Sequence, residues 1–285
     1  LKVGALFMEQ GTGKTRVAVE LIDSTGVDFA LFFAPFSTKT NLEEELKKWE
    51  LKTDYEIIAY ETISSSDKIY LELLNKIDTY NKLFIVADES IFIKNEETKR
   101  FMRIMEFAKR SEYRLILNGT PITKNEWDLY NQMEFLSPLI INMSREEFLH
   151  TFFTKVKYKK KFEQPREFYK LSKVNVDYLQ RLIEPYIFKV SFEFDKEERI
   201  EKCMIMSSVE TTEKYYELKE ELLRKIAEGE SFMNILAKMQ YETFTDEERC
   251  EKIGKKIKGQ TIVYSTYIKE AEIIAKHSNG LLITG

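Results

Sequence analysis

The sequence predicts an α/β fold in which a parallel sheet is flanked by helices. Within the first 140 residues, five short apolar runs alternate with helix-like segments; the runs are GALFME, DFALFFA, YEIIAY, KLFIVAD and YRLILNG. Strands that are apolar on both faces are typical of parallel sheets covered by helices. The first run leads straight into a glycine-rich turn, in a chain that has only 10 glycines. We therefore expect the functional loops to follow the carboxyl ends of these strands.

The pattern changes after residue 140. Residues 141–258 are predicted to form a mainly helical insertion or linker, with long charged segments such as TTEKYYELKEELLRKIAEG and a basic segment within KVKYKKKFEQPREFYK. Residues 259–285 combine an apolar run (QTIVYST), a helix-like segment (IKEAEIIAKHS) and another apolar run (GLLITG). The chain is thus expected to hold one α/β domain at 1–140, the insertion at 141–258, and the beginning of a second α/β domain at 259–285.

Composition indicates a globular, intracellular protein. Of the 285 residues, 43% are apolar and 32% are charged, and the net charge is −4. No overall field therefore draws the chain to nucleic acid or to an anionic membrane, and any such contact must be local. No window approaches eighteen consecutive apolar residues, and the first residues lack a signal-peptide pattern. Two distant cysteines and two histidines make a disulfide or a His/Cys metal site unexpected.

The turn after the first run, MEQGTGKT at residues 8–15, resembles a phosphate-binding loop. Glycines let successive backbone N–H groups face a polyphosphate, and the helix that follows adds its positive dipole end. Met8 departs from the GxxxxGKT pattern, which has a small residue there, and a glycine-rich turn without a ligand is the alternative. The residues predicted to bind ATP are Gly11, Thr12, Gly13, Lys14, Thr15 and Arg16. Lys14 would reach the β- and γ-phosphates, and the Thr15 hydroxyl would bind Mg²⁺.

The run LFIVADES delivers two acids to the end of another strand, about seventy residues downstream. Asp88 is predicted to hold the Mg²⁺, together with Thr15. Glu89 is predicted to act as the general base that orients and deprotonates the water attacking the γ-phosphate. Taken alone, Asp-Glu after a strand is also a common way to begin a loop. With the phosphate loop upstream, Lys14, Asp88 and Glu89 become the candidate catalytic set.

The run RLILNGTPITKNEWDLYNQMEFLSP resembles the Swi/Snf-type ATPases of helicase superfamily two. Those proteins carry a Leu-Thr-Gly-Thr-Pro-Ile loop and a helix ending in Phe-Leu-x-Pro, which Leu117–Ile122, Phe135, Leu136 and Pro138 match except for Asn118. The acid segment DESIFIKN resembles the family through Lys94 and Asn95, although Ser90 and Ile91 stand where the family has Ala and His.

Other segments extend the resemblance. FFAPFSTKTNLEEELKKW, which ends at Trp49, resembles the DNA-contacting motif of the family, and AYETI resembles its Thr/Ala-Tyr-Glu segment. The segment around Lys189 is similar to the linker into the second lobe, and residues 259–276 are similar to the first strand and helix of that lobe. The resemblance implies two RecA-like lobes, of which 1–140 would be the first, ATP-binding lobe.

The resemblance also implies a function, which is ATP-driven translocation on double-stranded DNA. Ser37, Thr38 and Lys39, at the start of a predicted helix, are suited to contact a phosphate backbone. Thr120 would couple the DNA side to the nucleotide side, a role carried over from the family. Within the basic segment, Lys159, Lys160 and Lys161 are candidates for DNA contact; the alternative is a solvated helix or hairpin. If four to six cations of this segment met phosphates, log affinity would fall with log salt at a slope of about −4 to −5.

The chain is expected to be an internal portion of a longer ATPase of bacterial or phage origin, located in the cytoplasm. The family completes its ATP site with an arginine from late in the second lobe, worth about 10³- to 10⁵-fold in rate. These residues alone are therefore expected to bind ATP and Mg²⁺ and to hydrolyse ATP slowly. Two alternatives remain: a non-catalytic nucleotide-gated DNA clamp or protein-docking module, and an RNA helicase, whose Ser-Ala-Thr motif is not found here.

Overall fold

A computed structural model describes residues 2–120, 128–158, 166–191 and 201–283 of the chain. The chain divides into two compact units, Leu1–Asp195 and Lys196–Gly285, and each is described by itself. Among the described residues, none of the helices has both the length and the apolar composition needed to span a lipid bilayer.

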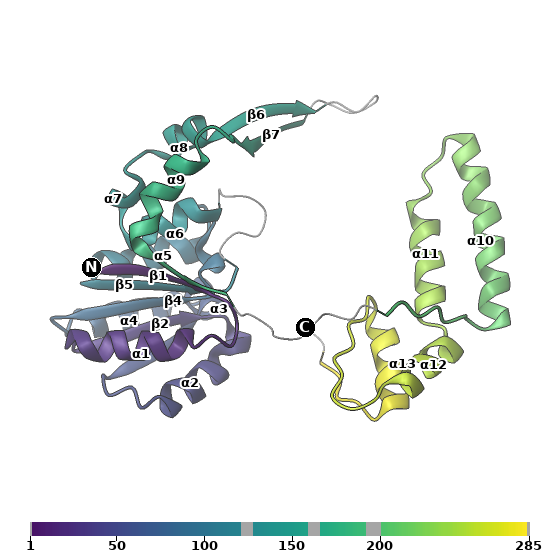
Figure 1. The fold of residues 1–285 in the computed structure, drawn as a ribbon, viewed down its shortest axis with the longest axis horizontal. Helices are drawn as coiled ribbons and strands as arrows, with labels where there is room; N and C mark the ends of the chain where they lie inside the picture. Colours follow the sequence, from purple (N-terminus) through teal and green to yellow (C-terminus); the bar gives the residue numbers. More distant parts are fainter. Residues whose placement is uncertain (1, 121–127, 159–165, 192–200, 284–285) are drawn as a thin grey trace. The chain divides into compact units, whose positions relative to one another are not determined.

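The first unit is built on a six-stranded sheet (Figure 1). Its strands are β1 (Val3–Met8), β2 (Phe29–Ala34), β3 (Tyr55–Ala59), β4 (Leu83–Asp88), β5 (Tyr113–Asn118) and β8 (Ile187–Val190). The order across the sheet is β3-β2-β4-β5-β1-β8, and every neighbouring pair is parallel. The five strands predicted from the apolar runs are confirmed, and so is the parallel α/β fold.

Two hydrophobic cores cover the two faces of the sheet, as the alternation within β2 illustrates. Phe29, Leu31 and Phe33 pack into one core, whereas Ala30, Phe32 and Ala34 pack into the other. The second core is closed by helices α1 (Lys14–Thr25) and α2 (Lys39–Lys48). The first core is closed by α3 (Tyr60–Ser65), α4 (Asp67–Ile77), α5 (Lys99–Arg110) and α6 (Asp128–Leu136). Because both faces are covered, the central residues of the strands are apolar on both faces, and polar residues such as Glu56, Asp88 and Arg114 lie near the strand ends.

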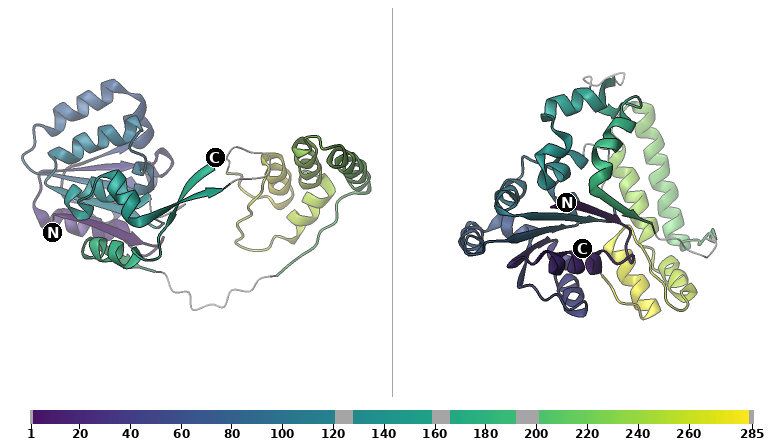
Figure 2. Two further views of the ribbon diagram at one scale, coloured as in Figure 1. Left: turned by 90° about the horizontal axis from the view of Figure 1, so that it is seen from above. Right: turned by 60° about the vertical axis from the view of Figure 1, so that its left-hand side comes forward.

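The segment between residues 138 and 191 is less helical than the sequence predicted. Helices α7 (Pro138–Ile141), α8 (Arg145–Phe152) and α9 (Val176–Ile183) are joined by an antiparallel hairpin of β6 (Phe153–Tyr158) and β7 (Arg166–Leu171). The hairpin extends away from the sheet (Figure 2). The chain then returns through the short turn η3 (Glu184–Tyr186) to β8, beside β1. This sixth strand was not predicted because its four residues, IFKV, are too few to form a pattern.

The second unit contains helices α10 (Val209–Glu228), α11 (Met233–Phe244), α12 (Glu247–Lys256) and α13 (Ile268–Ser278). The helix-like segment predicted at the start of a further α/β domain is therefore formed as α13. The apolar run before it is not part of any ladder in the described residues, where Ile262 is 79% and Tyr264 is 91% exposed. A strand is stable only when neighbouring strands satisfy its backbone.

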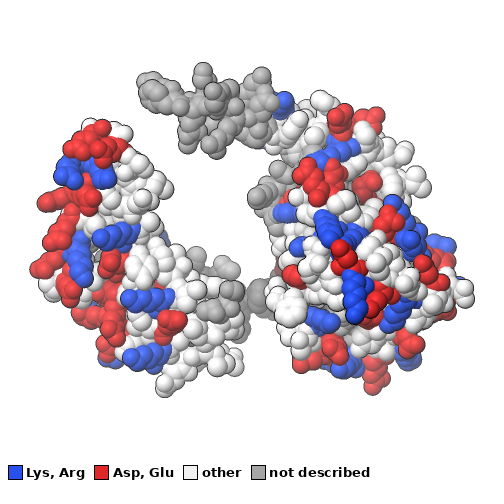
Figure 3. Space-filling view, turned by 180° about the vertical axis from the view of Figure 1, so that it is seen from behind, with Lys and Arg blue, Asp and Glu red and all other residues white. Residues whose placement is uncertain are grey.

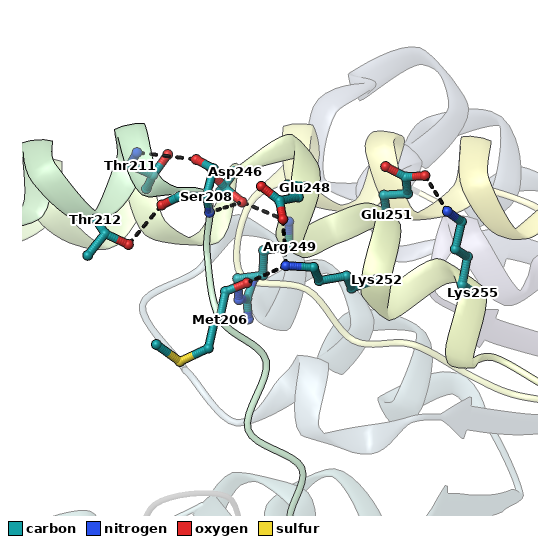
Figure 4. Close-up of polar contacts among 10 residues, drawn as sticks. All are labelled: Met206, Ser208, Thr211, Thr212, Asp246, Glu248, Arg249, Glu251, Lys252 and Lys255. Carbon is teal, nitrogen blue, oxygen red and sulfur yellow. Dashed lines mark hydrogen bonds and ion pairs between the residues drawn. The ribbon is translucent and has the colours of Figure 1, made fainter.

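Asp246 organises the second unit by joining the starts of two helices (Figure 4). Its carboxylate accepts hydrogen bonds from the Arg249 backbone N–H at 2.7 Å, which caps α12, and from the Ser208 hydroxyl at 2.6 Å. Ser208 is in turn the N-cap of α10. Burial opposes ionisation of Asp246, but the hydrogen bonds from Ser208, Thr211 and Arg249 together lower the pKa of its carboxyl. Arg249 also pairs with the buried Glu270 of α13 at 3.0 Å.

We predict that Asp246→Ala destabilises the second unit by about 2 kcal/mol, since the change removes the cap of one helix and releases the cap of another. Hydrogen exchange of the α10 and α12 amides in the whole chain measures this loss. Glu248→Ala is the matched control, because Glu248 lies in the first turn of α12 and forms an exposed ion pair with Lys252, worth about 0.3–0.5 kcal/mol. Equal protection losses in the two variants would contradict the assigned role of Asp246.

Candidate active site

The candidate site lies at the carboxyl edge of the sheet in the first unit. Since β1, β5 and β4 are parallel neighbours, their carboxyl ends and the loops that follow them meet at one edge. These loops carry the glycine-rich turn, Gly119–Thr120 and the Asp88–Glu89 pair. The structure therefore brings Lys14 and Asp88 to the same edge, and the charge of Lys14 acts on the carboxyl of Asp88.

The glycine-rich turn has the backbone that an anion-binding loop needs. Gly11 and Gly13 have φ of 79° and 89°, in the left-handed region that favours glycine. Helix α1 begins at Lys14 without a side-chain cap, so its first amides are not covered by a capping oxygen. Such amides, at the positive end of the helix dipole, attract phosphate groups.

The Lys14 side chain is folded back onto the loop. Its Nζ donates hydrogen bonds to the carbonyl oxygens of Met8 at 2.9 Å and Glu9 at 3.2 Å. The hydroxyl of Thr12 donates to the same Glu9 carbonyl at 2.6 Å. Gly119, after β5, lies close by, because a Cβ at that position would be 3.9 Å from the Lys14 Nζ and 3.6 Å from the Met8 carbonyl oxygen. A bulky residue at 119 would therefore crowd the path of the lysine.

The acid loop after β4 is held in one conformation. The hydroxyl of the fully buried Tyr60 donates to the Asp88 carbonyl oxygen at 2.8 Å, and the Asp88 carboxylate accepts from the Glu89 N–H at 3.0 Å. Glu89 itself has φ 50° and ψ 56°, in the left-handed region. A non-glycine residue keeps this conformation only when its surroundings enforce it. The short helix η2 (Ser90–Ile93) follows directly.

Burial and, to a lesser extent, the neighbouring charge of Glu89 raise the pKa of the Asp88 carboxyl to about 6, against the hydrogen bond from the Glu89 N–H and the charge of Lys14, which lower it. A desolvated carboxylate of this kind is suited to a divalent cation, which would favour its charged form. The Thr15 hydroxyl and the Asp88 carboxylate are hard oxygen donors, the type that Mg²⁺ prefers. The described residues contain no group of three or more metal-ligating side chains. This sparse set fits a Mg²⁺ ion that is held by one or two protein ligands plus substrate phosphates.

The predicted nucleic-acid loop follows β2, at the same edge. The turn η1 (Phe36–Thr38) leads into α2 at Lys39, with Ser37 exposed and Thr38 and Lys39 partly exposed. The loop is held from behind, since the Glu61 carboxylate accepts a hydrogen bond from the Phe36 N–H at 3.0 Å. The guanidinium of Arg16, predicted to contact the nucleotide, lies over the Trp49 ring at the end of α2, 4.9 Å from its centre.

Tyr60 and Glu61 have structural roles that the sequence did not reveal. Tyr60 bonds to the acid loop, and the adjacent Glu61 bonds to the loop before α2. Two consecutive residues thus connect both loops. The signal was present in the AYETI segment, which resembles a family motif, but its contacts depend on the fold.

The other predicted contacts are only partly visible. Thr120 is exposed, and its N–H donates to the Asn118 side-chain oxygen at 2.9 Å. Lys159, Lys160 and Lys161 lie outside the described residues. In the adjacent strands, the exposed Lys155 and Lys170 pair across the hairpin with Tyr169 and Thr154. On the face drawn in Figure 3, basic and acidic side chains are interspersed over each unit, in keeping with the small net charge.

Comparison with known proteins identifies related chains. Residues 36–270 match the family described as the SNF2-related domain. The chromatin remodeling factor mit1 of Schizosaccharomyces pombe is 26% identical over 171 residues, which cover 49% of this chain and 12% of that protein. The ISWI chromatin-remodeling complex ATPase ISW1 of Saccharomyces cerevisiae is 28% identical over 167 residues, which cover 50% of this chain and 14% of that protein. The chain thus spans a small part of the length of these relatives.

Among solved structures, the Hef helicase domain of Pyrococcus furiosus is 16% identical, with 47% of this chain and 33% of that chain covered at a TM-score of 0.34. The family match of residues 36–270 includes the acid loop and the loop before α2. The glycine-rich turn precedes the matched range, so its assignment depends on its own backbone geometry.

The buried carboxylate of Asp88 leads to a prediction about stability. Its folded pKa of about 6 lies above the ordinary value of 3.8, so the folded chain binds this proton more tightly than the unfolded chain. The contribution of Asp88 to stability therefore falls as the pH rises from about 4 to about 6, and is least favourable above 6. Asp88→Asn keeps the shape and removes the charge. At pH 8 and without ligand, we expect it to stabilise the chain by up to about 3 kcal/mol.

Thermal denaturation of both chains at pH 8 and at pH 5 measures this effect, and the gain should shrink at the lower pH. Asp78→Asn is the control, since Asp78 is exposed and pairs with Arg110. A gain of the same size at Asp78, or none at Asp88, would show that desolvation is not the cause.

Proposed function

This chain belongs to the family of SNF2-related domains, and from that premise we propose that it is the ATP-binding core of a DNA-dependent ATPase that moves along duplex DNA. The observation that carries the proposal is the meeting of Lys14 and Asp88 at the carboxyl edge of one sheet, with the charge of the lysine acting on the acid. A cation and a desolvated acid beside a helix N-terminus are suited to bind a nucleoside triphosphate with its Mg²⁺.

Each residue at this edge has a separate role in the proposed ATP hydrolysis. The amides from Gly11 to Thr15 bind the phosphates. Lys14 exchanges its hydrogen bonds to the Met8 and Glu9 carbonyls for the β- and γ-phosphates. Thr15 and Asp88 would hold a Mg²⁺ ion, which would supply positive charge beside the phosphate oxygens. Glu89 orients the attacking water and accepts its proton. Arg16, stacked on Trp49, joins the nucleotide loop to α2.

The loop before α2 supplies the nucleic-acid side of the proposal. Ser37, Thr38 and Lys39 stand at the start of that helix and can hold one DNA phosphate backbone. Lys159, Lys160 and Lys161 would add further phosphate contacts, and Thr120 would couple the nucleotide and DNA sides. The relatives named as a chromatin remodeling factor and a chromatin-remodeling ATPase support an ATP-driven role on DNA. These relatives are eukaryotic, and the bacterial or phage origin stays a prediction.

We predict that duplex DNA stimulates ATP turnover by the intact protein, whereas these 285 residues alone bind ATP and hydrolyse it slowly.

Lys14→Ala should abolish ATP binding, because it removes the cation that contacts the phosphates. Glu89→Gln should keep ATP affinity within about twofold and lower turnover at least about 100-fold, the scale of general-base catalysis. Titration with ATP and steady-state turnover with and without duplex DNA measure these effects.

The control is Lys2→Ala, at the opposite end of β1, where Lys2 pairs with Glu112 at 2.8 Å; ATP binding should be unchanged. Unaltered ATP affinity in Lys14→Ala would show that the glycine-rich turn is not the ATP-binding loop. ATP binding without turnover in the intact protein would favour the nucleotide-gated DNA clamp. ATP turnover that is the same with and without duplex DNA would exclude the translocase function.

We further predict that Glu61→Ala lowers the apparent affinity for duplex DNA about three- to tenfold, because the Phe36 N–H loses a charge-assisted hydrogen bond that fixes the DNA loop. Its ATP affinity should stay the same. The DNA concentration that gives half-maximal stimulation measures the change. Glu56→Ala is the control and should leave DNA dependence unaltered, because Glu56 lies near the amino end of β3, away from the loop before α2, and pairs with Lys76. A loss of DNA affinity of the same size in both variants would argue against the proposed role of Glu61.

A further inference from the structure

Three buried polar side chains lie together beneath the acid loop. Ser90, Asn118 and Gln132 are 0%, 1% and 0% exposed, and they come from η2, the end of β5 and the middle of α6. Uncompensated burial of an amide or hydroxyl costs about 1–3 kcal/mol. Three such groups at one place therefore require hydrogen-bond partners.

The three side chains form one directed chain of hydrogen bonds. The Asn118 Nδ2 donates to the Ser90 Oγ at 3.2 Å. The Ser90 hydroxyl donates to the Gln132 Oε1, and the Gln132 Nε2 donates to the Asp128 carbonyl oxygen at 2.7 Å. At the other end, the Asn118 Oδ1 accepts from the Thr120 N–H at 2.9 Å. Asn118 thus contacts the acid loop with its nitrogen and the Gly119–Thr120 loop with its oxygen.

This series of hydrogen bonds restricts the backbone conformation of Glu89. Glu89 is held in the left-handed region, between Asp88, which Tyr60 fixes, and Ser90. Two other bonds act directly on this strained residue: its N–H donates to the Asp88 carboxylate at 3.0 Å, and its carbonyl accepts from the Phe92 N–H at 3.0 Å. With Ser90 free to turn, these bonds and the Tyr60 bond would have to resist relaxation without the hydrogen bonds that Ser90 makes. The hydrogen bonds to Ser90 therefore fix the second side of Glu89.

Asn118 and Ser90 are also two of the positions at which the sequence departs from the Swi/Snf-type pattern, which has Thr and Ala there. The structure places these two departures in direct contact. A buried donor at position 118 without an acceptor at position 90 costs folding free energy, and so does the acceptor without the donor, whereas the bonded pair is favourable. The two residues therefore behave as one unit.

Resting on the proposed ATPase function, we propose that Ser90, Asn118 and Gln132 are positioning residues that hold Glu89 ready for catalysis and join it to the Thr120 loop. All three side chains are buried, so their effect on the reaction is transmitted through Glu89. Their effect is on the rate of the chemical step and on its response to DNA, while nucleotide binding at the glycine-rich turn stays intact.

The experiment compares Asn118→Ala, Ser90→Ala, Asn118→Thr and the double variant Ser90→Ala/Asn118→Thr in the intact protein. We expect each single change to lower kcat about five- to fiftyfold, the cost of one unpaired buried group, with the Kd for ATP within about twofold. The double variant should lose at least about threefold less activity than the product of its single changes, since the Asn118 amide nitrogen and the Ser90 hydroxyl that it bonds are replaced together.

Arg114→Met is the matched control. Arg114 lies at the opposite end of β5 and donates to the Phe135 and Leu136 carbonyls of α6 at 3.3 and 3.0 Å, so it ties the same strand to the same helix far from the acid loop. It should lower Tm without lowering kcat. An equal fall of kcat in Arg114→Met, an unchanged kcat in Asn118→Ala, or multiplicative effects in the double variant would each overturn the positioning proposal.

Hydrogen exchange of the Phe92 and Thr120 amides in nucleotide-free protein separates this proposal from the proposed function. Both amides should exchange faster in Asn118→Ala than in Arg114→Met. If the wild-type protein binds no ATP, the ATPase assignment fails, while exchange still reports whether the acid loop is held. If wild-type turnover depends on Glu89 but neither kcat nor exchange responds to Asn118→Ala, only the positioning proposal fails.

Discussion

The site depends on one electrostatic arrangement, in which a desolvated carboxylate and a lysine occupy the same edge of a parallel sheet. Burial makes the charged form of Asp88 costly, and Lys14 offsets only part of this cost. The Lys14 ammonium group meanwhile donates hydrogen bonds to the carbonyl oxygens of Met8 and Glu9. A triphosphate with Mg²⁺ would relieve both groups, because it brings anions to the lysine and a cation to the carboxylate. On the proposed function, the cost of burying the Asp88 carboxylate in the free chain would favour binding of this ligand.

The sheet order makes this arrangement possible. With β5 between β1 and β4, the glycine-rich turn and the acid loop flank the Gly119 loop. Each loop is then fixed by a side chain from a neighbouring element: Tyr60 fixes the acid loop, Glu61 fixes the loop before α2, and Asn118 joins the acid loop to Thr120. Because these bonds cross between strands, a displacement of one loop changes the energy of the others. In the proposed ATPase, such shared bonds would provide a physical route for coupling between ATP and nucleic acid.

The second unit is stabilised by a different means. Its helices are organised by the capping carboxylate of Asp246 and by the ion pair between the partly buried Arg249 and the buried Glu270, which ties α12 to α13. These polar contacts specify where helices begin and which helices pair, whereas the two cores of the first unit fill space between sheet and helices. A buried ion pair is sensitive to removal of one partner, so Arg249 and Glu270 depend on each other.

The sequence by itself determined the five strands, the glycine-rich turn and the acid pair, because each is a local pattern: an apolar run, glycines at fixed spacing, or two acids at a strand end. It did not reveal β8, since four residues carry no period and the strand is stabilised only by pairing with β1. It also did not reveal that Glu61 meets Phe36, or that Asn118 meets Ser90, which are 25 and 28 residues apart. Contacts at such separations arise from strand order and register, which only the tertiary structure decides.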